Sequence, residues 1–165
     1  MLEKALNFKP DIFIPDMEDS VPTGEKKNAR NLIAKYLPKL AKSGVPIIPR
    51  VNSLDTEWAV DDMTAVVGPY IYGISIGKIN APADIKRVSE HLSILERKAG
   101  LNEGHIKMIP WLESAKAIIH CYEICLASER LVGVAFGGED FTHDMGIERL
   151  EDESEVSFAR NQLCI

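Results

Sequence analysis

The chain has 165 residues, of which 45% are hydrophobic and 27% charged, as is ordinary for one soluble globular domain. Its formal net charge of -6 argues against non-specific binding to nucleic acid or to an anionic membrane. No apolar run is long enough to span a bilayer, and three cysteines make no disulfide framework, which indicates a reducing compartment such as the cytoplasm.

Short apolar runs alternate along the chain with amphipathic patterns of helical period. The runs predict strands at residues 11–16, 46–51, 70–76, 105–110 and 131–136. The helical patterns cover residues 24–41, 55–67, 83–99, 114–128 and 154–163. Strands that alternate with helices build a parallel sheet through right-handed crossovers, so we expect an α/β fold.

Charged or polar residues lie at or just beyond the C-terminal end of each predicted strand. They are Asp16, Glu18 and Asp19, then Arg50 and Asn52, then Lys78, then Glu113, and finally Glu139 and Asp140. An open sheet gathers such residues at one switch point, whereas a barrel aims the end of every strand at one mouth. The pattern therefore favours a (β/α)₈ barrel, although a full barrel needs about 250 residues and this chain is short by about two or three βα units.

The segment Gly137-Gly138-Glu139-Asp140 follows the last predicted strand. Its glycines allow a sharp turn, and its carboxylates suit a divalent cation or a polar substrate. A turn with solvated acids is an equally good interpretation of this segment alone. Cys121 and Cys125, beside His120, are spaced unlike a zinc site, so we expect core thiols there.

Six short motifs occur in a characteristic order. They are D-M-E-D-S-V at 16–21, K-x-x-A-R at 26–30, R-V-N at 50–52, G-K-I at 77–79, L-E-S-A at 112–115 and G-G-E-D-F at 137–141. They resemble D-L-E-D-A-V, K-x-x-A-R, R-V-N, P-K-V, I-E-T-A and G-x-x-D-L of the HpcH/HpaI aldolase and citrate lyase beta-subunit family, which also holds malyl-CoA and citramalyl-CoA lyases. Glycine replaces the proline of P-K-V.

The resemblance covers nearly the whole chain and implies a single partial TIM-barrel lyase domain over residues 1–165. The chain would supply the second to the sixth of eight βα units. The implied activity is Mg²⁺-dependent cleavage or formation of a carbon–carbon bond in a 3-hydroxyacyl-CoA such as citryl-CoA, malyl-CoA or citramalyl-CoA, which yields an acyl-CoA and a 2-oxo acid. Two alternatives remain open: an inactive barrel fragment that binds a metal or a partner, and an aldolase acting on free 2-oxo acids.

The resemblance also assigns roles to the residues at the strand ends. Glu113 and Asp140 would hold Mg²⁺, with a helix N-terminal charge as the alternative for Glu113. Arg50 would contact substrate or stabilise an enolate, unless it is an ion-pair partner of Glu18 or Asp19. Glu18 and Asp19 would hold metal-bound waters or orient Arg50 and Lys78. The alternative is that these two acids are simply charges at the N-terminus of a helix.

For the basic residues a functional interpretation stands beside a structural one. Lys78 would neutralise charge at the mouth, and a Schiff-base lysine is disfavoured because a metal-dependent aldolase needs none. Lys26 and Arg30 lie on one helical face and would meet CoA phosphates, or simply face solvent. His143 is a candidate proton shuttle, with a surface histidine as the better-supported interpretation.

The expected partners are small molecules, a CoA thioester and a 2-oxo acid. The family further implies a homo-oligomer, a trimer or hexamer. The expected location is the cytoplasm, or the mitochondrion if an N-terminal segment precedes this sequence.

Overall fold

The computed structural model of the chain describes residues 2–165. Four parallel strands form one sheet in the order β1-β2-β3-β4: Arg50–Val51, Gly73–Ile76, Lys107–Leu112 and Ala135–Phe136. The strands lie side by side in the order in which they occur in the chain, and a doubly wound sheet would reverse that order at a switch point. The predicted α/β fold is confirmed, and the sheet is an arc of a barrel.

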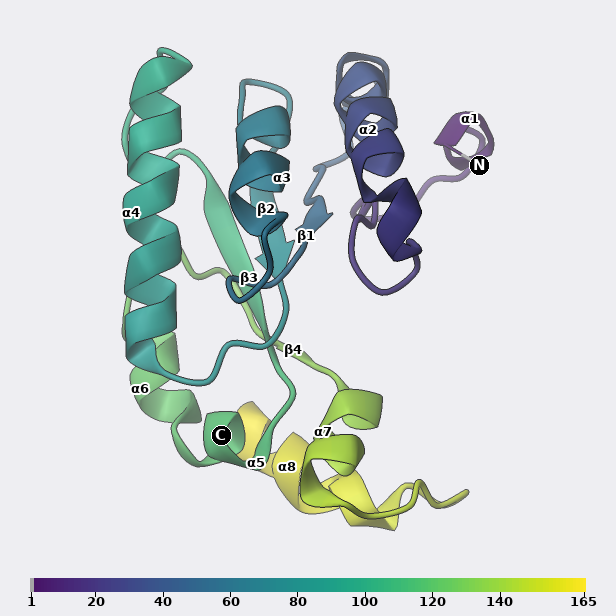
Figure 1. Ribbon diagram of the computed structural model, residues 1–165, viewed down its shortest axis with the longest axis vertical. Coiled ribbons are helices and arrows are strands. Elements are labelled where there is room, and N and C mark those ends of the chain that lie inside the picture. Colours follow the sequence, from purple (N-terminus) through teal and green to yellow (C-terminus); the bar gives the residue numbers. More distant parts are fainter. Residues whose placement is uncertain (1) are drawn as a thin grey trace.

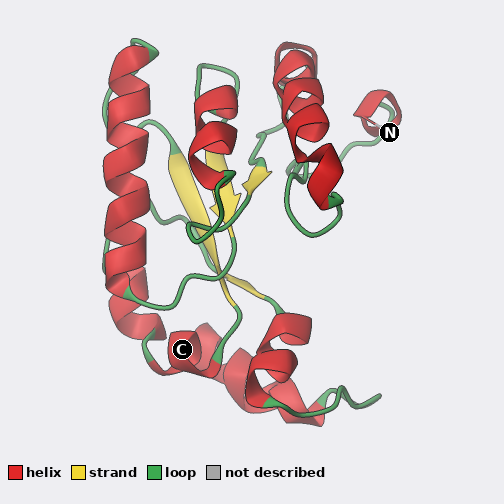
Figure 2. Cartoon of the chain, in the orientation of Figure 1, coloured by secondary structure: helices red, strands yellow, loops and turns green. Residues whose placement is uncertain are grey.

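The helices form an outer layer and a second group beyond the strand ends (Figure 1). The outer layer consists of α2 (Lys26–Ala41), α3 (Ala59–Val66) and α4 (Pro82–Lys98). The second group lies beyond the C-terminal ends of β3 and β4 and consists of α5 (Ala115–Ile119), α6 (Cys121–Cys125), α7 (Gly138–Met145) and α8 (Ser157–Cys164). Short pieces α1 (Leu2–Ala5), η1 (Thr23–Glu25) and η2 (Ser154–Val156) complete the structure, as Figure 2 shows.

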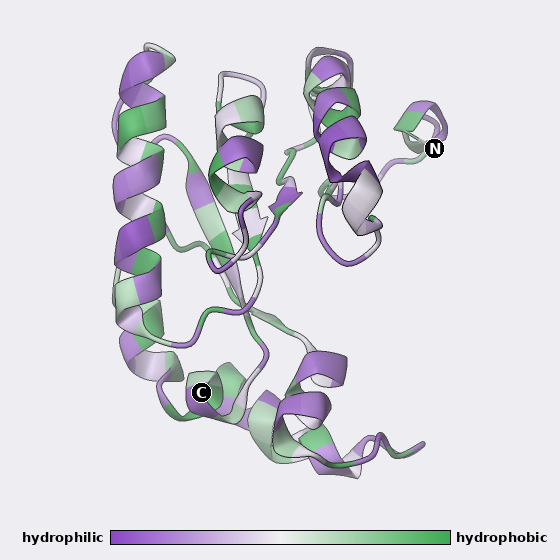
Figure 3. Ribbon diagram, viewed as in Figure 1, coloured by the Kyte–Doolittle hydropathy of each residue, from purple (hydrophilic) through white to green (hydrophobic). Residues whose placement is uncertain are grey.

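The core lies between the sheet and the outer helices. All four residues of β2 are buried, as expected for a parallel strand covered on both faces. On β3 burial alternates, with Met108, Pro110 and Leu112 buried while Ile109 and Trp111 are partly exposed on the opposite face. The buried side of α4 is apolar at Ile85, Val88 and Leu92, and its outer side is charged (Figure 3).

The first predicted strand, residues 11–16, is a bridged segment rather than a regular strand. Phe13 pairs with Ile47, and Asp16 pairs with Arg50, each as an isolated bridge. Prolines interrupt both partners, at positions 15, 46 and 49, and each removes one N–H donor from the ladder. The segment still lies next to β1 and places its acids beside Arg50.

Three other local predictions change in the structure. The helix expected over 114–128 is divided at His120 into α5 and α6, and α7 follows β4 where no helix was predicted. The expectation of core thiols is correct for the buried Cys121 and wrong for Cys125, which is exposed on the same helix. None of the described helices has the length and apolar character needed to cross a bilayer.

Candidate functional site

The C-terminal ends of the strands bring the candidate residues together. The register pairs Arg50 of β1 with Ser75 of β2, Ser75 with Ile109 of β3, and Trp111 with Ala135 of β4. Glu113 follows β3 directly, Lys78 lies two residues past the end of β2, and Asp140 lies in the first turn of α7, four residues past the end of β4. The site is therefore built by the sheet, at the end where ligands of α/β barrels bind.

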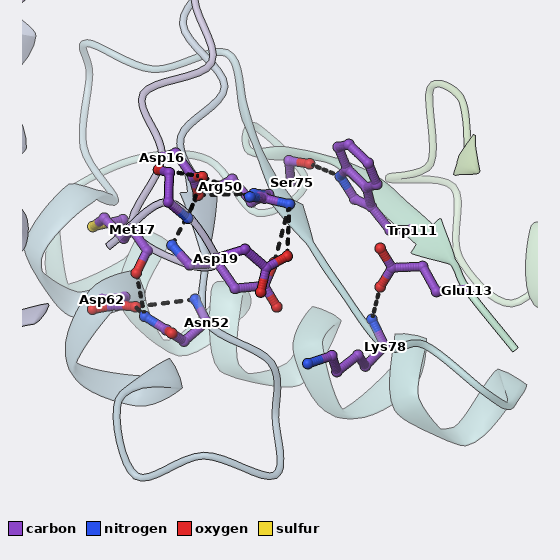
Figure 4. A network of polar contacts seen from close by, with 12 residues as sticks. Asp16, Met17, Asp19, Arg50, Asn52, Asp62, Ser75, Lys78, Trp111 and Glu113 are labelled. Carbon is purple, nitrogen blue, oxygen red and sulfur yellow. Dashed lines mark hydrogen bonds and ion pairs between the residues drawn. The ribbon is translucent and has the colours of Figure 1, made fainter. Parts of the chain in front are cut away.

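Glu113 is a buried carboxylate at the centre of this site. Its Oε2 atom accepts a hydrogen bond of 2.9 Å from the Lys78 N–H, as Figure 4 shows. Two glycines make room for it: a Cβ built on Gly137 would overlap its Oε1 atom and lie 2.7 Å from its Cγ, and a Cβ on Gly77 would lie 3.2 Å from its Oε2. Burial raises the pKa of Glu113, and the Lys78 N–H opposes that rise while the charge of Asp140 adds to it.

Asp140 approaches Glu113 from the first turn of α7. Both carboxylates line a pocket of about 280 Å³ together with Lys78. The other lining residues are Asp55, Asn80, Ser114, His143 and Asp144. Sequence reasoning did not single out Asp55, Asn80 or Asp144, because isolated polar residues carry no motif of their own, and it gave no role to Ser114 although the L-E-S-A motif contains it.

The donor set of this pocket fits Mg²⁺. No group of three or more His, Cys, Asp or Glu side chains gathers round one point within residues 2–165, and among the carboxylates that line the pocket Glu113 and Asp140 are the pair that follows neighbouring strands. Mg²⁺ commonly takes one or two carboxylates and completes its octahedron with water and substrate oxygens. The buried Oε2 atom of Glu18 has no hydrogen-bond partner in the described chain and could accept from such a water.

Glu18 lies beside Glu113. A Cβ on Gly77 would fall 2.8 Å from Oε1 of Glu18, so the same glycine gives space to both carboxylates. Glu18 is 5% exposed, and burial together with the charge of Asp19 raises its pKa to about 7. It is thus a carboxyl group that exchanges a proton near neutral pH.

Arg50 is held mainly by Asp16, a residue that the sequence predictions did not name as its partner. Arg50 donates from Nε to Oδ1 of Asp16 at 2.8 Å and from Nη2 to Oδ2 at 2.6 Å. Its Nη1 atom lies 3.4 Å from carboxylate oxygens of Glu18 and Asp19, so the predicted ion pairs exist but are looser. Burial would raise the pKa of Asp16, but hydrogen bonds led by Arg50 hold that pKa well below its usual range.

Lys78 contributes both its backbone and its side chain. Its φ of 58° lies in the left-handed region, which is uncommon for a residue other than glycine and is often found at functional sites. This conformation aims its N–H at Glu113, while its exposed side chain lines the pocket. Exposure also argues against a Schiff-base role for Lys78, because a lysine of that kind typically lies in a desolvated pocket.

Lys26 and Arg30 have different partners from those expected. The Lys26 ammonium is buried, donates to the carbonyls of Met17 at 3.1 Å and Glu18 at 2.7 Å, and lies over the Trp58 ring. Arg30 pairs with Asp61 and Asp62 at 3.1 and 2.7 Å. These contacts lend no support to CoA phosphate binding by either residue; Lys26 instead fixes the backbone that carries Glu18.

Comparison with known proteins places the chain beside carbon–carbon lyases. A profile of the HpcH/HpaI aldolase/citrate lyase family matches residues 1–165. Citrate lyase subunit beta of Haemophilus influenzae is 32% identical over 160 residues, which are 97% of this chain and 55% of that protein. An L-malyl-CoA/beta-methylmalyl-CoA lyase of Haloarcula marismortui is 31% identical and matches 87% of this chain and 45% of its own length.

Solved structures share the fold. A lead(II) complex of Haloferax volcanii malate synthase superposes with a TM-score of 0.87 at 22% identity, over 99% of this chain and 52% of that one. The citrate lyase beta subunit of M. tuberculosis, complexed with oxaloacetate and magnesium, has a TM-score of 0.72 at 20% identity, over 97% of this chain and 64% of that one. The chain spans about half the length of the curated relatives it matches.

Proposed function

This chain belongs to the HpcH/HpaI aldolase/citrate lyase family, and we propose that it carries the metal- and oxo-acid-binding centre of a lyase that acts on a 3-hydroxyacyl-CoA. Candidate substrates are citryl-CoA, malyl-CoA and citramalyl-CoA, since relatives are named for citrate, malyl-CoA and citramalyl-CoA cleavage. One observation carries the proposal: Glu113 and Asp140, which follow neighbouring strands, line one pocket.

The bonds that change in the proposed reaction are simple. The C3 hydroxyl of the CoA thioester loses its proton, the bond between C2 and C3 breaks, and its electron pair passes to C2 as the enolate of an acyl-CoA. The 2-oxo acid leaves with the former hydroxyl oxygen as its keto oxygen, and C2 of the enolate then takes up a proton. In the direction of synthesis the same steps run in reverse.

Glu113 and Asp140 would hold Mg²⁺, which supplies a Lewis acid and a template for the oxo-acid oxygens when it is bound. Arg50 offers its Nη1 edge to a carboxylate or enolate oxygen, because its other edge is committed to Asp16 and Nη1 itself makes only the long contacts of 3.4 Å to Asp19 and Glu18. Lys78 places positive charge at the wall of the pocket that the acids also line. These groups stabilise negative charge that develops as the carbon–carbon bond breaks.

The test is turnover by the purified chain. It is incubated with Mg²⁺ and each of the three CoA thioesters, and acyl-CoA and 2-oxo acid products are measured by liquid chromatography. We expect product with at least one thioester and none with Asp140→Asn. The matched control is Glu139→Gln, because Glu139 lies in the same turn of α7 but points to solvent and contacts Arg149.

The two alternatives give different results in the same experiment. Mg²⁺-dependent oxo-acid binding without turnover of any thioester would favour the inactive binding module. Turnover of free 2-oxo acids that added CoA does not inhibit would favour an aldolase without CoA.

A further inference from the structure

Three side chains from neighbouring strands form a continuous line across the site: those of Arg50, Ser75 and Trp111. Arg50 on β1 pairs in register with Ser75 on β2, and Ser75 pairs with Ile109 on β3. Trp111 lies two residues beyond Ile109, so its side chain emerges on the same face of the sheet, and Glu113 is two residues further on. The line therefore runs from the candidate substrate-binding arginine to the strand that carries a candidate metal ligand.

The contacts along this line are specific. Trp111 donates from Nε1 to Oγ of Ser75 at 2.6 Å, and Ser75 is buried. The guanidinium carbon of Arg50 lies 5.1 Å from the centre of the Trp111 ring, within the range of a cation–π interaction. Figure 4 shows the Trp111 indole reaching Ser75 beside the Arg50 guanidinium. The indole N–H fixes the ring, and the ring contacts the arginine.

Asp16 alone does not fix the plane of the guanidinium. Its two hydrogen bonds hold the Nε and Nη2 edge, and the group can still tilt about that edge. The outer end, Nη1, donates a hydrogen bond of 3.4 Å to Oδ2 of Asp19 and lies 3.4 Å from Oε2 of Glu18, and both contacts are longer than an ordinary charged hydrogen bond. Oε2 of Glu18 is buried, with no hydrogen-bond partner in the described chain, so it is a strong competitor for Nη1.

We propose that Trp111, oriented by Ser75, is a positioning residue that holds the plane of Arg50 so that Nη1 faces the oxygen of an oxo acid instead of closing on Glu18. This inference rests on the proposed function for the identity of the ligand. The contact itself does not depend on it. A tryptophan suits this role because it combines a large aromatic face with a donor at the ring edge.

The experiment compares Trp111→Leu, Trp111→Phe and Ser75→Ala, with Trp58→Phe as the matched control, since Trp58 lies over Lys26 instead. The first readout is the NMR signal of the Arg50 Nε–H, assigned with Arg50→Lys. An aromatic ring shifts nearby protons by its ring current. We expect Trp111→Leu to abolish the shift, Trp111→Phe and Ser75→Ala to reduce it, and Trp58→Phe to leave it unchanged.

The second readout is oxaloacetate affinity in the presence of Mg²⁺. A partly desolvated cation–π contact corresponds to a loss of about tenfold in affinity for Trp111→Leu, with a smaller loss for Trp111→Phe that retains a ring. Trp58→Phe is expected to bind as the wild type does.

An Arg50 signal that is the same in Trp111→Leu and wild type would overturn the proposal, as would unchanged oxaloacetate affinity in a variant whose Arg50 signal has moved. If the signal moves as expected and wild type itself binds no oxaloacetate, the proposed function fails while the positioning of Arg50 stands. Should Trp111→Leu not fold, Trp111→Phe and Ser75→Ala carry the test, because the first retains an aromatic ring and the second removes a single oxygen atom.

Discussion

Gly137→Ala tests how closely the backbone must approach Glu113. The added Cβ would overlap Oε1 of Glu113 and lie 2.7 Å from its Cγ, so the Cγ has to retreat by about 0.7 Å before ordinary contact begins at 3.4 Å. Gly137 has φ of -100° and ψ of 93°, which alanine adopts freely, so the effect is steric and not conformational. The strain of such overpacking is about 1–3 kcal/mol of folding free energy.

The displacement matters more for the metal than for the fold. Mg²⁺ demands near-octahedral geometry, and plausible sites keep ligand distances within about 0.2 Å of ideal values. We therefore expect Gly137→Ala to weaken Mg²⁺ binding about tenfold or more, equivalent to ~1.4 kcal/mol or above. Isothermal titration with Mg²⁺ measures the affinity, and thermal melting measures the stability.

Gly133→Ala is the matched control. It lies four residues earlier, and a Cβ there meets nothing within 4 Å. It should bind Mg²⁺ like wild type. Equal Mg²⁺ affinities for Gly137→Ala and Gly133→Ala would refute the reasoning, because Glu113 could not then be both the ligand and the group that the new methyl displaces.

Three further predictions concern stability and association. In the wild type, Nη2 of Arg130 binds Oε2 of the buried Glu96 at 2.7 Å. Arg130→Met leaves Glu96 charged, buried and without this partner, so it should lower the free energy of unfolding, measured in urea, by about 3–5 kcal/mol. A loss below ~1 kcal/mol would contradict this. Burial raises the pKa of Glu18 from 4.5 to about 7, so the folded chain binds this proton more tightly than the unfolded chain does. The free energy of unfolding should therefore fall by up to about 3 kcal/mol as the pH rises from 4.5 to 7, and this contribution should not change further above pH 7. Glu18→Gln should remove this part of the slope of melting temperature against pH, and identical slopes would argue against it. Finally, Ile12 and Ile14 are 39% and 49% exposed on the outer edge of the sheet, where an apolar edge can pair with another chain. Light scattering on a size-exclusion column should therefore give a mass above the 18.3 kDa of the monomer. A sharp monomer peak with protected amides at both positions would show that the edge is covered.

The strand-and-helix order and the convergence of strand ends could be predicted from the sequence, because they follow from hydrophobic period and parallel topology. Glu113, Asp140 and Lys78 line one pocket, since each lies within four residues of the C-terminal end of a strand of one parallel sheet. That prediction needs no distances. It needs only the knowledge that parallel strands end at the same edge.

Contacts between distant side chains could not be predicted in this way. Alternation indicates that Asp16 and Glu18 share a side, but only the structure shows that Asp16 takes two donors of Arg50 and leaves the Oε2 atom of Glu18 without a hydrogen bond. Lys26 likewise turns its ammonium inward to two carbonyls, although its position in a helical pattern suggested a surface residue. A rotamer and a nearby acceptor decide these outcomes, and neither is encoded in spacing.

Local chemistry also overrode the period at two helices. The start of α7 is a glycine followed by two acids, a composition that indicates a turn, yet the helix forms there and presents Asp140 from its first turn. The break at His120 divides one long amphipathic pattern into α5 and α6. At α7 the two acids lie in the first turn, where the helix dipole favours negative charge, and at His120 the backbone leaves the helical region with φ of -97° and ψ of 13°.

The central claim is that Glu113 and Asp140 together form a Mg²⁺ site. It is tested most directly by isothermal titration of Mg²⁺ into wild type, Asp140→Asn and Glu139→Gln at the same pH. The account predicts measurable binding by wild type and Glu139→Gln, and a loss of about tenfold or more in Asp140→Asn, which keeps the shape of the side chain but loses its charge. Equal affinity of Asp140→Asn and wild type for Mg²⁺ would contradict the claim.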